Sequence, residues 1–196
     1  MIIEGVKSLG IADIKVITYK KFMDFRGHFC ETINKPQLTI FNDYSFVQFN
    51  ESRSNPFTVR GLHFQTSPPM GKLVRTIYGH MIDVALDIRR DSKTFGKIIM
   101  YEMPSDNYSD FGEWIWIPPG FAHGVVSITE TIIEYACTST WNKESEESIS
   151  VYSRDIDWSL CDKNLKKCFE VIMDSTPLIS EKDKNAIEFS SWRHKL

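Results

Sequence analysis

Two histidines, His63 and His123, stand in sequence contexts that favour chemistry. His63 follows Arg60-Gly61-Leu62 within an alternating run, where the glycine permits a ligand to approach the backbone closely. A single histidine on a strand fits either a satisfied core residue or a general base, so both interpretations stay open here. His123 ends the segment 118–123, a Pro-Pro-Gly turn that leads into the next strand. The remaining histidines have neighbours that indicate no particular chemistry: His28, His80 and His194.

The segment that ends at His123 fits P-x-G-x-x-H and so resembles half of the signature of the cupin barrels. Many cupins bind a transition metal through an H-x-H pair, a glutamate and this later histidine. Here His63-Phe64-Gln65 stands in place of H-x-H, and the next carboxylates, Asp83 and Asp87, have the wrong spacing. A transition metal needs three or four such ligands, so we expect no metal. A barrel interior with His, Lys, Arg and Tyr indicates acid–base chemistry on an anionic substrate instead.

Short alternating runs fill the chain from residue 14 to residue 138. Apolar and other residues alternate over 80–89, which predicts a strand with one apolar face. Further strand-like runs cover residues 14–19, 45–49, 58–65, 72–78, 97–103, 114–117, 124–129 and 131–138. Clusters of Pro, Gly, Asn and Ser separate them. This pattern predicts a mainly β protein, namely an antiparallel sandwich, jelly roll or barrel.

The C-terminal part has a different pattern. Apolar residues from Leu165 to Ile172 recur at helical spacing, which predicts an amphipathic helix over 163–173. Ser180 is the expected N-cap of a second helix, with Asp183 three residues later as in a capping box. The chain shows no internal repeat and no low-complexity stretch, so we expect one domain over residues 1–196.

The composition is that of an ordinary globular protein. Apolar residues make up 42% and charged residues 25% of the 196, which argues against disorder and collagen-like structure. Lys plus Arg number 23 and Asp plus Glu 26, so the net charge of −3 gives no attraction to nucleic acid or an anionic membrane. No apolar run approaches the ~18 residues of a membrane span. The four cysteines form no C-x-x-C pair and the start has no signal-peptide pattern, so we expect reduced thiols and a cytoplasmic location.

Seven motifs occur in an order that resembles the dTDP-4-dehydrorhamnose 3,5-epimerase family, a metal-free branch of the cupins. They lie at 26–31, 48–50, 60–65, 71–75, 83–89, 94–96 and 116–124, and the resemblance covers about residues 10 to 185. It implies a cupin jelly roll with short C-terminal helices. It also implies an epimerase that inverts C3, C5 or both in a nucleotide-linked 4-keto-6-deoxy sugar through an enolate. The family has no cofactor and works as a homodimer with strand exchange, and we expect the same here.

The resemblance also implies a role for each site residue. His63 matches the family's base and Asp183, in the segment that matches L-S-x-K-D, its carboxylate partner. Tyr135 matches the acid on the opposite face, and Lys72 suits the enolate oxygen. Two purely structural alternatives stay open: Asp183 could serve only as a helix cap, and Tyr135 could serve only as a core residue. The expected substrate contacts are Arg26 and Arg60 for the pyrophosphate, Glu31 and Gln48 for the nucleoside, Phe29 or Trp141 for stacking, His123 near the C4 oxygen, and Asn50.

Two departures from the family pattern leave the substrate open. His28 replaces an aromatic residue, and Thr140-Trp141 replaces a Tyr-Tyr pair. The nucleotide (dTDP or GDP), the sugar (hexose or heptose) and the carbon inverted are therefore not fixed by the sequence. One alternative is a monofunctional C3 or C5 epimerase that acts on a GDP-linked 4-keto heptose. Another is a sugar-nucleotide-binding cupin without catalysis. The segment 161–176 is longer than the family pattern suggests, and its role is also open.

Overall fold

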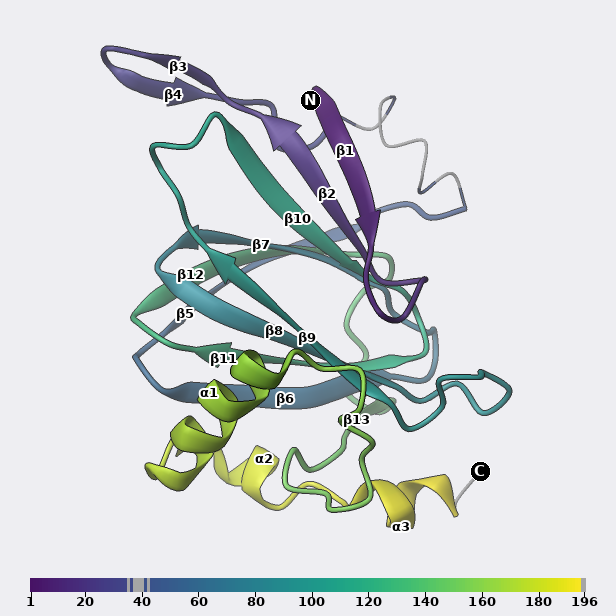
Figure 1. Cartoon of the computed structure of the whole chain (residues 1–196). Helices are drawn as coiled ribbons and strands as arrows, with labels where there is room; N and C mark the ends of the chain where they lie inside the picture. The colour runs from purple at the N-terminus through teal and green to yellow at the C-terminus, as the bar shows by residue number, and fades with distance from the viewer. Residues whose placement is uncertain (35, 37–40, 42, 195–196) are drawn as a thin grey trace.

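Two antiparallel sheets pack face to face in the computed structural model, which describes residues 1–34, 36, 41 and 43–194. In spatial order, the first sheet comprises β1 (Ile3–Ser8), β2 (Lys15–Lys20), β10 (Phe111–Ile117), β7 (Lys72–Tyr78), β12 (Thr131–Cys137) and β5 (Gln48–Ser54). The second comprises β13 (Glu146–Ser148), β6 (Thr58–Gln65), β11 (Phe121–Ser127), β8 (His80–Asp87) and β9 (Ile98–Pro104), and β14 (Leu178–Ile179) pairs parallel to β6. The mainly β jelly roll that the sequence predicted is therefore present (Figure 1).

The core between the sheets is built from alternate residues of facing strands. Val16 and Val74 of the first sheet belong to the same buried cluster as Met81 and Ala85 of β8. Side chains of a sandwich interdigitate in this way because every second residue of each strand points inward. The inward-facing residues of the central strands therefore decide what any internal cavity contains.

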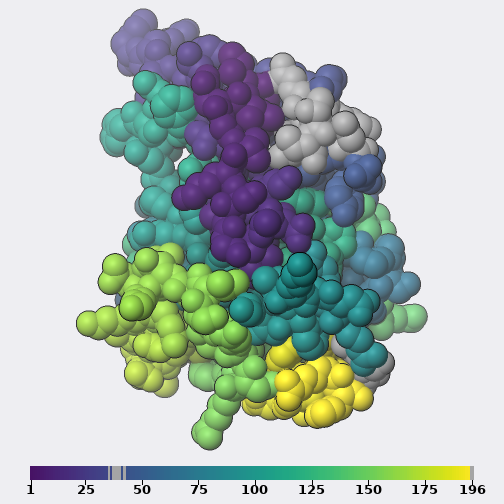
Figure 2. Space-filling view, turned by 45° about the vertical axis from the view of Figure 1, so that its right-hand side comes forward, coloured from purple at the N-terminus to yellow at the C-terminus, as the bar shows by residue number. Residues whose placement is uncertain are grey.

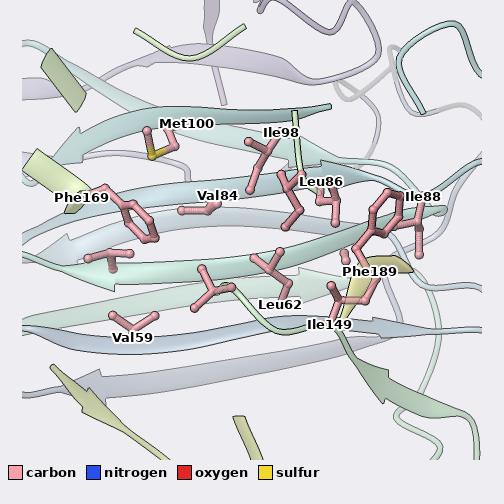
Figure 3. Close-up of a cluster of buried hydrophobic side chains, with 14 of the residues drawn as sticks. Val59, Leu62, Val84, Leu86, Ile88, Ile98, Met100, Ile149, Phe169 and Phe189 are labelled. Atoms are coloured by element: carbon pink, nitrogen blue, oxygen red, sulfur yellow. The ribbon is translucent and has the colours of Figure 1, made fainter. Parts of the chain in front are cut away.

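In the described part of the chain, three helices lie at the end of the molecule opposite the hairpin over residues 22–29, as Figures 1 and 2 show. They are α1 (Lys163–Asp174), α2 (Glu181–Lys184) and α3 (Phe189–Arg193). Phe169 of α1 and Phe189 of α3 pack onto Val84 and Leu86 of β8, in the cluster drawn in Figure 3. The segment 161–176 thus covers the outer face of the second sheet. None of the helices in the described part of the chain is long and apolar enough to cross a membrane.

The structure corrects the sequence prediction at several elements. Strand β8 is buried on both faces, so the prediction of a single apolar face is wrong, because the C-terminal segment covers the side that an open sheet would expose to water. The run at 45–49 is a strand only from Gln48 onward, and the run at 124–129 starts earlier, at Phe121. The helix at 163–173 is confirmed, with Asp162 as its N-cap. Elements that the alternation did not indicate are β1, β13, β14, α3 and the hairpin of β3 (Phe22–Asp24) and β4 (Gly27–Phe29).

Candidate active site

A cavity of about 460 Å³ opens between the two sheets. Its walls come from strands far apart in the sequence, because β5, β7 and β12 face β6 and β11 across the sandwich. Most of the side chains that the sequence singled out line it: Gln48, Asn50, Arg60, His63, Lys72, His123, Tyr135 and Trp141. The volume lies within the ~300–1,000 Å³ that is common for small-molecule sites.

His63 and Asp183 form a hydrogen-bonded pair at one wall. His63 Nε2 lies 2.6 Å from Asp183 Oδ1, although 120 residues separate them in sequence. Asp183 is 5% exposed, and its second oxygen accepts a hydrogen bond from the Gly61 backbone N–H. Burial opposes ionisation of Asp183, but the hydrogen bond from His63 and the charge of its imidazolium outweigh burial and lower the pKa of this carboxyl. The Ser180 side chain caps α2, as predicted, so the Asp183 carboxylate is not needed as a cap and binds His63 instead.

A close approach of two strands places the two histidines opposite each other. Gly61 has φ +111°, and a Cβ there would lie 2.6 Å from the His123 carbonyl oxygen, so only glycine fits. The β6–β11 pairing pairs His63 with His123 and shifts register between His123 and Val125. A bulge of this kind re-aims side chains next to a site. The glycine in the motif at 60–65 therefore serves strand packing at the cavity wall.

His123 has its own carboxylate partner, which the sequence did not identify. Its Nε2 lies 2.7 Å from Asp83 Oδ2, and Asp83 is 1% exposed. The other oxygen of Asp83 has no hydrogen-bond partner among the described residues, so it keeps an unused acceptor. From the sequence, we considered Asp83 only as a possible metal ligand. The alternation over 80–89 places Asp83 on the face opposite the apolar residues, so the sequence carries no signal that this carboxylate is buried.

Lys72 and Tyr135 reach the cavity from the first sheet. Burial lowers the pKa of the Lys72 amine, while Cys137, Glu146 and Asp83 act in the opposite direction. Burial raises the pKa of Tyr135, the nearby Cys137 adds to this, and Arg60 opposes it. Tyr135 therefore remains a protonated phenol at neutral pH, which is the form that donates a proton. Since its ring packs on the interior cluster and also lines the cavity, core and acid roles are compatible.

Glu146 completes one rim of the cavity and was not among the predicted site residues. Its carboxylate lies 2.5 Å from the Lys182 amine, next to Asp183 in sequence. Burial opposes its ionisation, but the Lys182 contact and the charge of His63 lower the pKa of Glu146. Across the opening, the Trp141 backbone N–H donates to Gln48 Oε1 at 2.8 Å. These two contacts fix helix α2 to β13 and the loop at Trp141 to β5.

Three predicted substrate contacts do not line the cavity: Arg26, Phe29 and Glu31. Arg26 lies in the β3–β4 hairpin, which projects from the body in Figure 1, and its guanidinium pairs with Asp24. Phe29 is 68% exposed, and Glu31 pairs with the N-terminal ammonium of Met1. The sequence assigned these three residues to the substrate by family resemblance alone, and the structure does not bring them to this cavity.

The described residues offer no cluster of three or more His, Cys, Asp or Glu side chains that could hold a metal ion. Instead, each cavity histidine is bonded to a single carboxylate. The fold and the cavity together define a jelly roll of the cupin class with an interior built from paired acid–base groups.

Comparisons with known proteins narrow this class to a family. The profile of the dTDP-4-dehydrorhamnose 3,5-epimerase family matches residues 8–191. The enzyme of that name from Methanothermobacter thermautotrophicus is 38% identical over 87% of this chain and 86% of its own, and that from Pseudomonas aeruginosa is 36% identical over 93% and 94%. The crystal structure of dTDP-6-deoxy-D-glucose-3,5-epimerase from Legionella pneumophila, with dTDP-4-keto-L-rhamnose, superposes with a TM-score of 0.80 at 31% identity and covers 95% of this chain and 93% of that one.

This chain belongs to the dTDP-4-dehydrorhamnose 3,5-epimerase family and is an isomerase with the cupin fold. The relatives above are named for dTDP-linked sugars. They give no support to the alternative of a GDP-linked 4-keto heptose, nor to a cupin without catalysis.

Proposed function

We propose that the protein inverts C3 and C5 of a dTDP-linked 4-keto-6-deoxy hexose by proton removal and return next to the ketone. The observation that carries this proposal is that His63 of β6, paired with Asp183 of α2, and Tyr135 of β12 in the other sheet line one cavity. Exchange of a proton α to a carbonyl needs a base on one face of the ring, an acid on the other and a group that stabilises the enolate oxygen. The cavity supplies all three.

In the proposed mechanism His63 is the base. Its Nε2–H donates to Asp183, which leaves Nδ1 to take the proton from C3 or C5. As the C–H electron pair moves into the ring, negative charge develops on O4, where Lys72 and His123 stabilise it. Tyr135 then donates its phenolic proton to the same carbon from the opposite face, and the configuration inverts. Solvent returns a proton to Tyr135 and removes one from His63, so the cycle closes.

We propose that the nucleotide lies toward the opening of the cavity, with the sugar deeper inside. Arg60 lines the cavity and makes no carboxylate contact among the described residues; its Nε donates to Ser54 Oγ at 3.0 Å. Its guanidinium therefore remains available for the pyrophosphate. Gln48 and Asn50 of β5 also line the cavity, as does Trp141, whose backbone N–H donates to Gln48, and a nucleoside joined to the sugar would contact these three residues.

We also propose a homodimer in which the hairpin of one copy reaches the cavity of the other. Phe25 is 96% and Phe29 68% exposed on this projecting element, and large apolar side chains gathered on one surface favour a partner. Such an arrangement would bring Arg26, Phe29 and Glu31 to a nucleotide. Light scattering measures the mass, and a mixture of two inactive variants, His63→Ala and Arg26→Ala, tests the exchange. Recovery of activity on mixing supports it, and a monomer at micromolar concentration contradicts it.

We propose a cytoplasmic location, as the cysteine pattern led us to expect. The four cysteines are free thiols in the structure, which suits a reducing compartment. Cell fractionation tests this, and secretion with oxidised cysteines would overturn it.

The decisive test of function is incubation with dTDP-linked and GDP-linked 4-keto sugars in deuterated water. Nuclear magnetic resonance then shows which carbons gain deuterium and whether the product is inverted. We expect deuterium at C3 and C5 of the dTDP-linked 6-deoxy sugar. Exchange at only one carbon would identify a monofunctional enzyme, and no exchange with any sugar would refute the proposal.

A further inference from the structure

The polar cavity has an apolar patch formed by two β-branched side chains. Val125 comes from β11 and Ile133 from β12, so the two sheets contribute one residue each. Each is 6% exposed, and both belong to the buried cluster between the sheets. Neither has a role in the proton transfers described above. An aliphatic surface that faces a cavity gains free energy when an apolar group of a ligand covers it.

The position of the patch follows from strand periodicity. Val125 lies two residues beyond His123 on one inward face, and Ile133 lies two residues before Tyr135 on the other. The β6–β11 pairing sets Val125 directly opposite Arg60. The patch therefore lies beside the acid–base groups, at the level of the arginine proposed for the pyrophosphate.

The geometry of a pyranose ring predicts which substrate atom meets this patch. C4 carries the ketone and points toward Lys72 and His123 in the proposed mechanism. C6 is bonded to C5, which is the neighbour of C4 and one of the carbons that Tyr135 protonates in this mechanism. The C6 group therefore lies beside His123 and Tyr135, where Val125 and Ile133 line the cavity.

We infer that Val125 and Ile133 form the pocket for C6 and select a 6-deoxy sugar over its 6-hydroxylated counterpart. This inference rests on the proposed function. A methyl group covers the patch, whereas a hydroxymethyl group would lose hydrogen bonds to water against two aliphatic walls. A hydrophobic pocket discriminates against an added hydroxyl by about 10²-fold at most, so we expect a ratio of about 10 to 100 in kcat/KM between the two sugars.

The test compares deuterium exchange of dTDP-4-keto-6-deoxyglucose and dTDP-4-keto-glucose on the same preparation of each variant. A ratio measured in this way does not depend on the fraction of protein that is folded. Val125→Thr replaces one methyl group of the patch by a hydroxyl, so the ratio should fall at least about fivefold from the wild-type value, toward parity. Val74→Thr is the matched control, because Val74 belongs to the same cluster but does not line the cavity. Its ratio should equal that of the wild type.

Ile133→Val provides a second measurement if Val125→Thr does not fold. It removes one methylene from the patch without a new polar group, so kcat/KM for the 6-deoxy sugar should fall about fourfold, the value of one buried methylene. Equal ratios in wild type, Val125→Thr and Val74→Thr would overturn the inference while the proposed function stood. Absence of exchange with both sugars in the wild type would instead refute the proposed function, and this inference with it.

Discussion

Replacement of Asp183 by Asn tests the central pair of the site. The carboxylate touches His63 at 2.6 Å and is nearly inaccessible to water, so its charge acts on the imidazole with little screening. The charge stabilises the imidazolium that forms when His63 takes the substrate proton, so its loss should slow proton removal.

The asparagine amide adds a second effect. In Asp183 both oxygens accept hydrogen bonds, one from His63 and one from the Gly61 N–H. An amide has only one such oxygen, so its NH₂ must face one of the two donors. Where it faces His63, it forces the tautomer in which Nδ1 carries the proton and cannot accept another. We therefore expect exchange at C3 and C5 to slow by about 10² to 10⁴ in total, the usual contribution of general acid–base groups.

Two pH profiles distinguish this mechanism from general damage to the fold. The acid limb of kcat/KM should move in Asp183→Asn, because the side chain that contacts the base has lost its charge. The carboxyl of Asp183 has a lowered pKa in the folded protein, so it stabilises the wild type above its unfolded pKa of about 3.9. That contribution to the free energy of unfolding is lost as the pH falls through the folded pKa. In urea unfolding, the stability of Asp183→Asn should therefore not show this decrease at acidic pH.

Asp13→Asn is the matched control, since it removes an exposed carboxylate that pairs with Arg89 and does not line the cavity. Its exchange rate and acid limb should equal those of the wild type. If Asp183→Asn exchanged protons within about threefold of the wild-type rate with an unmoved acid limb, the assignment of the base would be refuted.

Three further predictions concern the same site. His63→Ala should lower proton exchange by about 10²–10⁴-fold or more with the fold intact by circular dichroism, and near wild-type exchange at C3 or C5 would contradict its role as base. Tyr135→Phe keeps the ring volume, so solvent deuterium should still enter from the His63 side with retained configuration while inversion falls sharply; full-speed inversion of both carbons would show that another group is the acid. Dialysis against a chelator should leave activity unchanged, because Lys72 and His123 can stabilise the enolate oxygen; a loss that Fe, Mn or Zn restores would reverse this.

Local patterns in the sequence determined most of the elements that carry the site. The strand over 58–65 was predicted with its observed bounds, because alternation and flanking turns are properties of the nearby chain. The same holds for β7, which carries Lys72, and for the cap at Ser180. The family motifs added the identity of the chemistry, since they fix residue types at each position.

The tertiary structure decided which side chains meet. The partner of His123 is 40 residues away at Asp83, and nothing local in the sequence distinguishes that carboxylate from Asp87, which instead binds Arg89. Burial of both faces of β8 likewise depends on where α1 and α3 dock. Hydrogen bonds between remote residues depend on the register and separation of whole sheets, which in turn depend on close approaches such as that at Gly61. Periodicity along one strand carries no information on these distances, because they are properties of how the strands pack.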